Sequence, residues 1–125
     1  MKHTVLLIED NETNRYLATF LLEKHGFNVV VALDGAQGIE QARACQPDLI
    51  LLDIQLPGMD GYAVARTLRD IDALAATPIV AVTSYAMVGD REKSLAAGCN
   101  GYVEKPINPA TFVDEISRYL PQSPA

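Results

Sequence analysis

Four apolar runs in this 125-residue chain are each followed by polar side chains of the kinds that handle phosphate and divalent cations. Carboxylates offer oxygen ligands, hydroxyls can donate to a phosphoryl oxygen, and a lysine ammonium can neutralise its charge. Together these groups are the parts that phosphoryl transfer onto an aspartate requires. They are Glu9 and Asp10 after Val5–Ile8, Asp53 after Leu49–Leu52, Thr83 and Ser84 after Ile79–Val82, and Lys105 shortly after Gly101–Val103.

The three carboxylates favour a bound cation. If Glu9, Asp10 and Asp53 lie within about 6 Å of one another, each pair of charges repels by roughly 3 kcal/mol at an effective dielectric constant of about 20. A divalent ion relieves this repulsion. Because the ligands are oxygens, with no histidine or cysteine among them, the sequence predicts Mg²⁺ at this site, with Mn²⁺ as a substitute.

The elements that must position these side chains alternate along the chain. Apolar runs rich in Val and Ile are typical of strands buried on both faces of a parallel sheet. Helical patterns lie between them, so the sequence predicts an α/β fold with helices on both faces of that sheet. The functional crevice of such a sheet lies at the carboxyl ends of its strands, where the polar residues stand. The predicted strands are Val5–Ile8, Val29–Ala32, Leu49–Leu52, Ile79–Val82 and Gly101–Val103.

The helical patterns differ in how much apolar surface they offer. Ala86–Ala97 contains a glycine and has only Leu95 and small alanines to bury, so we expect it to be the least firmly packed helix. The other patterns have clear stripes or caps. They are Thr13–His25 with Leu17, Phe20 and Leu21, a helix capped by Asp34 that ends near Gln46, one with Val64, Leu68 and Ile71, and one that starts at Asn108 and Pro109 and continues to Leu120.

Length and charge narrow the function further. A chain of 125 residues fits one domain, which we expect over residues 1–120 with a short polar tail at 121–125. The net charge of −6 argues against nucleic acid and against an anionic membrane surface as partners. No apolar run is long enough to span a bilayer, and the start does not have the pattern of a signal peptide, so the sequence favours a cytoplasmic protein.

Four segments together resemble the receiver domains of response regulators, the CheY-like family. They are residues 5–11, 47–61, 78–84 and 101–107, with the sequences VLLIEDN, PDLILLDIQLPGMDG, PIVAVTS and GYVEKPI. The chain also resembles stand-alone receivers of the DivK type, which carry no output domain. The resemblance implies a flavodoxin-like, doubly wound sheet of five parallel strands in the order 2-1-3-4-5, with five helices.

The resemblance also implies a role for each site residue. Asp53 matches the phosphoacceptor, and Lys105 matches the lysine that contacts the phosphoryl group, followed by an expected cis peptide bond at Pro106. The implied metal ligands are Glu9, Asp10, Asp53 and the main-chain oxygen of Gln55. Thr83 and Tyr102 match the two switch residues, and the positions of Gln55 and Tyr85 tune the lifetime of the phosphorylated state in this family.

The implied function is a phosphorylation switch. A sensor histidine kinase or a histidine phosphotransfer protein would supply the phosphoryl group, and the chain would catalyse only its own phosphorylation and dephosphorylation. A downstream protein would bind the fourth helix, fifth strand and fifth helix, with Tyr85, Met87 and Tyr102 as candidate contacts. The kinase-facing side of the first helix would include Asn14, Arg15 and Ala18. The resemblance implies a monomer, with dimerisation on phosphorylation as the alternative.

Other classes fit the residues less well. A haloacid-dehalogenase-type enzyme needs a second catalytic aspartate where this chain has Gln55. A flavodoxin needs a phosphate-cradling loop where this chain has the acidic residues 9–12. A receiver-like module that binds partners without phosphorylation, and a receiver excised from a longer histidine kinase, remain as alternatives.

Overall fold

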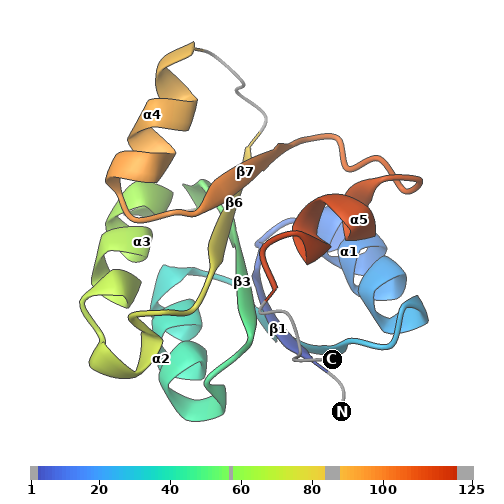
Figure 1. Ribbon diagram of the computed structural model, residues 1–125, viewed down its shortest axis with the longest axis horizontal. Coiled ribbons are helices and arrows are strands. Elements are labelled where there is room, and N and C mark those ends of the chain that lie inside the picture. The colour runs from blue at the N-terminus through green and yellow to red at the C-terminus, as the bar shows by residue number, and fades with distance from the viewer. Residues whose placement is uncertain (1–2, 57, 84–87, 121–125) are drawn as a thin grey trace.

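Five parallel strands form the central sheet of the computed structural model, which describes residues 3–56, 58–83 and 88–120 (Figure 1). Their order across the sheet is β2-β1-β3-β6-β7. Because β4 and β5 form a separate two-stranded hairpin, this is the predicted order 2-1-3-4-5. The strands are β1 (Thr4–Ile8), β2 (Asn28–Ala32), β3 (Leu49–Asp53), β6 (Ile79–Thr83) and β7 (Gly101–Glu104).

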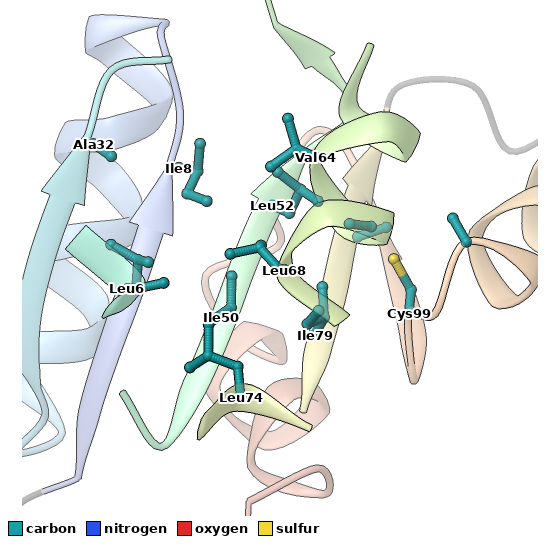
Figure 2. Packing of buried hydrophobic residues seen from close by; sticks show 14 of the residues in the cluster. Leu6, Ile8, Ala32, Ile50, Leu52, Val64, Leu68, Leu74, Ile79 and Cys99 are labelled. Carbon is teal, nitrogen blue, oxygen red and sulfur yellow. The ribbon is translucent and has the colours of Figure 1, made fainter. Parts of the chain in front are cut away.

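Helices cover both faces of the sheet. One face carries α1 (Glu12–Lys24) and α5 (Phe112–Ser117), and the other carries α2 (Gly35–Cys45), α3 (Gly61–Arg69) and α4 (Val88–Ala96) (Figure 1). Successive residues of a strand point to opposite faces, so each strand contributes side chains to two hydrophobic cores, one on each side of the sheet. Leu6 and Ile50 face the α2–α3 side (Figure 2), whereas Val5 and Leu49 face the α1–α5 side.

Side-chain caps fix where three helices begin. Asn11, Asp34 and Asp60 each accept a hydrogen bond from a backbone N–H of the first turn of α1, α2 and α3. This satisfies a donor that has no partner within the helix. The Asn11 cap matters most for function, because it ends the loop that follows β1 and therefore fixes where Glu9 and Asp10 stand.

Several predicted details are wrong. The last helix begins at Phe112, not at Asn108: the Asn108 side chain accepts a hydrogen bond from the N–H of Ala110, as a cap would, but residues 109–111 form a turn before the helix. Phe20 is 52% exposed, and the buried stripe of α1 is instead Ala18, Leu21 and Leu22.

Other features lie outside the predictions or outside the described residues. The hairpin of β4 (Gln55–Leu56) and β5 (Met59–Asp60) and the short 3₁₀ helix η1 (Asp72–Leu74) were not predicted. None of the described helices has the length and apolar character needed to cross a membrane. The predicted tail, residues 121–125, lies outside the described part of the chain.

Candidate functional site

Three carboxylates meet at the carboxyl edge of the sheet, as predicted. β1 and β3 are neighbours with Ile8 opposite Leu52, so Glu9, directly after β1, lies beside Asp53, the last residue of β3. One carboxylate oxygen from each of Glu9, Asp10 and Asp53 can be chosen so that all three lie within 4.8 Å of one another. Glu9 and Asp53 are each 2% exposed, whereas Asp10 is exposed. The site therefore opens to solvent beside Asp10.

Lys105 supplies a positive charge to this cluster. Its Nζ lies 3.0 Å from Glu9 Oε1 and 3.2 Å from Asp53 Oδ2. The lysine is held there by the backbone, because its N–H donates to the carbonyl of Thr83 at 2.8 Å. The expected cis peptide bond between Lys105 and Pro106 is present. The structure thus brings together Glu9, Asp53 and Lys105 in direct contact.

The single positive charge of Lys105 does not neutralise three carboxylates, and the pKa of Glu9 is raised both by its burial and by this excess of negative charge. Burial raises the pKa of Glu9 from 4.5 to about 7. The neighbouring carboxylate of Asp53 acts in the same direction, and Lys105 opposes both. A buried carboxylate that holds its proton near neutral pH needs more positive charge to ionise.

The donor set fits a hard divalent cation. All of the acidic ligands are oxygens, which Mg²⁺ prefers, and the exposed side of Asp10 leaves room for water ligands that this ion keeps. Gln55 lies next to the cluster, since its backbone N–H donates to Asp53 Oδ1 at 2.9 Å. This contact also orients the Asp53 carboxylate, leaving Oδ2 for Lys105.

The two predicted switch residues lie on neighbouring strands. Thr83 is the buried last residue of β6, directly after Val82, which pairs with Asp53. Tyr102 is half-buried on β7, opposite Ala81, and packs against the core on the α2–α3 side. Ser84, Tyr85 and Met87 lie outside the described residues, so their predicted places cannot be compared.

The predicted kinase-facing side of α1 is partly wrong. Ala18 is 1% exposed and packs in the core, so it is not part of a surface. Arg15 is half-buried and turns back toward the acidic site, where Nη1 donates to the carbonyls of Glu9 and Asp10. Sequence reasoning missed this contact. Its only signal was an arginine one helical turn after the acidic pair.

Gly61, the first residue of α3, is a second feature near the site. A Cβ at this position would collide with the backbone of Ile54, directly after Asp53, and the Gly61 N–H donates to the Ile54 carbonyl at 3.2 Å. Gly61 therefore lets α3 approach the site closely.

Comparison with known proteins agrees with this geometry. Residues 5–117 match the family model of the response regulator receiver domain. The polar-differentiation response regulator DivK of Brucella anthropi is 41% identical over 120 residues, which cover 96% of this chain and 98% of the relative.

Two solved structures are similar over most of their length. One is the receiver domain of the sensor histidine kinase PA1611 from Pseudomonas aeruginosa, which has a magnesium ion coordinated in its active-site cleft (35% identity, TM-score 0.87, 95% of this chain and 98% of that chain). The other is the receiver domain of Ssk1 from Saccharomyces cerevisiae in complex with the histidine phosphotransfer protein Ypd1 (29% identity, TM-score 0.86, 94% and 88%). The chain therefore belongs to the response-regulator receiver family and is a two-component signalling domain.

Proposed function

We propose that Asp53 accepts the phosphoryl group from a histidine kinase or a histidine phosphotransfer protein. The observation that carries this proposal is the placement of the Asp53 carboxylate, which is buried between Lys105, Glu9 and Asp10 at the carboxyl edge of the sheet. An acyl phosphate needs such surroundings, because negative charge gathers on the transferring group and must be met by fixed positive charge.

The chain's own residues account for the transfer. A carboxylate oxygen of Asp53 attacks the phosphorus in line, the phosphorus–nitrogen bond of the phosphohistidine breaks, and the imidazole leaves with the bonding electron pair and takes up a proton. The N–H of Gln55 keeps the carboxylate oriented, and Lys105 stands where a phosphoryl oxygen would arrive. Glu9, Asp10, Asp53 and the main-chain oxygen of Gln55 would hold Mg²⁺, or Mn²⁺ in its place, which neutralises charge on the phosphoryl oxygens when bound.

The same site can work as a switch. Phosphorylation of Asp53 replaces a carboxylate with a group that carries more negative charge and more acceptor oxygens. Lys105, directly after β7, already contacts the Asp53 carboxylate, and Thr83 ends β6 directly after the residue that pairs with Asp53. We expect both side chains to turn toward the phosphoryl group. We expect Tyr102 to move inward as Thr83 moves, and Gln55 and Tyr85 to tune how long the phosphoryl group survives.

The surface that changes is proposed to be the face of α4, β7 and α5. A hollow of about 490 Å³ lies there, and its lining includes Tyr102 together with Leu95, Glu104, Glu115 and Tyr119. Because Tyr102 belongs to both the switch and this lining, its movement would change the shape of the face directly. Tyr85 and Met87 are proposed as further contacts, for a downstream protein or for a second phosphorylated copy of the chain.

Phosphorylation from a small donor tests this function. The protein is incubated with acetyl phosphate and Mg²⁺ or with EDTA, and run on a phosphate-affinity gel beside Asp53→Asn and the control Asp72→Asn. Asp72 is exposed in η1, which precedes β6 and so lies away from the carboxyl edge. A Mg²⁺-dependent band in wild type and Asp72→Asn, absent from Asp53→Asn, is expected. A band that persists in Asp53→Asn would contradict the assignment.

A further inference from the structure

Arg15 places a second positive charge against the acidic site from the side of α1. Its Nη1 lies 3.2 Å from the carbonyl oxygen of Glu9 and 3.1 Å from that of Asp10. These are main-chain oxygens of the two residues whose carboxylates belong to the site. The arginine is half-buried, and these two hydrogen bonds turn its guanidinium toward the loop that follows β1.

The contact lies in the short segment between β1 and α1, which is also held by the Asn11 cap and by the Asn11 N–H, which donates to Glu9 Oε2 at 3.3 Å. Glu9 is the last residue fixed by the sheet, through its N–H to the carbonyl of Ala32, and α1 begins only at Glu12. Between them the Asp10 carboxylate is exposed and carries the same charge as Glu9 and Asp53. Repulsion between charged carboxylates favours spreading this segment, so each hydrogen bond to its backbone helps to keep the ligands together.

We propose that Arg15 is a positioning residue for the metal site, holding the peptide groups of Glu9 and Asp10 so that their carboxylates converge on Asp53. A guanidinium can bridge two carbonyls because its donors are rigid and planar, and a charged donor makes stronger hydrogen bonds than a neutral one. The inference rests on the proposed Mg²⁺ site, and it does not require Arg15 to touch the ion or the phosphoryl group.

Two effects of Arg15 on a cation have opposite signs, which makes the proposal testable. Its positive charge alone would repel Mg²⁺, so removal of that charge would tighten binding. Its hydrogen bonds pre-arrange the ligands, so their removal would weaken binding. We infer that the positioning effect dominates, since the guanidinium points at carbonyl oxygens rather than at the carboxylates.

Titration with Mg²⁺, followed by calorimetry at fixed ionic strength, gives the measurement. Arg15→Met removes the donors and the charge and keeps an unbranched stem, and is expected to weaken Mg²⁺ binding by roughly five- to tenfold. Arg15→Gln, which keeps a donor without the charge, should recover part of the loss. Arg43→Met on α2 is the matched control, since Arg43 is exposed in the last turn of its helix, and its affinity should match wild type.

The outcomes separate this inference from the proposed function. Unchanged or tighter Mg²⁺ binding in Arg15→Met would overturn the inference, as would a defect confined to phosphotransfer from a partner protein. If Arg15→Met does not fold, Arg15→Gln decides: this variant should bind Mg²⁺ more weakly than wild type, and equal or tighter binding would refute the role. If wild type itself binds no Mg²⁺, the proposed site fails first.

Discussion

Replacement of Glu9 by glutamine should stabilise the metal-free protein, and increasingly so as the pH rises. The carboxyl of Glu9 has a pKa of 4.5 in the unfolded chain. In the folded protein its pKa rises to about 7, because the group is buried and lies beside Asp53. The folded protein therefore binds this proton more tightly than the unfolded chain. The free energy of unfolding of the wild type therefore falls as the pH rises from 4.5 to about 7, and this loss is complete above about pH 7.

The magnitude follows from the two pKa values. At about 1.4 kcal/mol per pH unit, the raised pKa of Glu9 costs roughly 3 kcal/mol of stability at pH 8 and roughly 1 kcal/mol at pH 5.5. Glutamine has nearly the same shape, and its amide oxygen can still accept from Lys105 Nζ, so the variant avoids the cost and keeps this contact. Its NH₂ group replaces Oε2, which accepts from the Asn11 N–H at 3.3 Å, and the loss of that long hydrogen bond does not depend on pH. Its advantage over wild type should grow by about 2 kcal/mol between these two pH values.

Urea unfolding followed by far-ultraviolet circular dichroism measures this difference. Wild type, Glu9→Gln and the exposed-carboxylate control Glu23→Gln are compared in EDTA at the two pH values, and again with Mg²⁺ at the higher one. Mg²⁺ should shrink the advantage of Glu9→Gln, because it stabilises the ionised carboxylate of the wild type. An advantage that does not change with pH, or a Glu9→Gln variant less stable than wild type at the higher pH, would refute the reasoning.

Further substitutions test other parts of the structure. Thr83→Ala should still be phosphorylated by acetyl phosphate, but the ring resonances of Tyr102 should no longer shift with phosphorylation; Thr67→Ala, a hydroxyl on α3 that bonds its own helix, should behave as wild type. Ser94→Ala should raise the free energy of unfolding by about 1 kcal/mol in urea, because the buried Ser94 hydroxyl has no hydrogen-bond partner in the described structure. Gly61→Ala should lower the free energy of unfolding by roughly 1–3 kcal/mol, because the new Cβ would collide with the backbone of Ile54. Gly101→Ala, whose new Cβ would meet only the movable end of the Tyr119 side chain, should cost less.

The sheet and its acidic edge could be predicted because two strong physical rules act there. Strands buried on both faces must be continuously apolar, as β3 and β6 are, so they stand out in the sequence. The carboxyl ends of parallel strands lie at one edge, so Glu9, Asp53 and Thr83 had to come close whatever the loops did. The site was predictable because topology alone assembles it.

The parts that were missed depend on local competition between side chains. Asn108 makes a cap-like hydrogen bond to the N–H of Ala110, but residues 109–111 form a turn and α5 begins only at Phe112. In α1 the small Ala18 is buried and the large Phe20 is exposed. A pattern based on hydrophobicity predicts the opposite, because phenylalanine is the more hydrophobic residue.

Arg15 shows a further limit of sequence reasoning. A long side chain on the first turn of a helix can point to solvent or fold back over the preceding loop. The choice depends on carbonyls whose positions are set by the sheet and by the Asn11 cap, so spacing along the sequence does not reveal it.

Chemical location of the phosphoryl group tests the central claim most directly. The protein is phosphorylated by a phosphorylated histidine phosphotransfer protein, reduced with borohydride to convert an acyl phosphate to an alcohol, and mapped by tandem mass spectrometry. The modified residue is expected at position 53, in the peptide that contains Asp53, only when Mg²⁺ is present. A modification on Glu9 or Asp10, or transfer that proceeds equally in Asp53→Asn, would contradict the account.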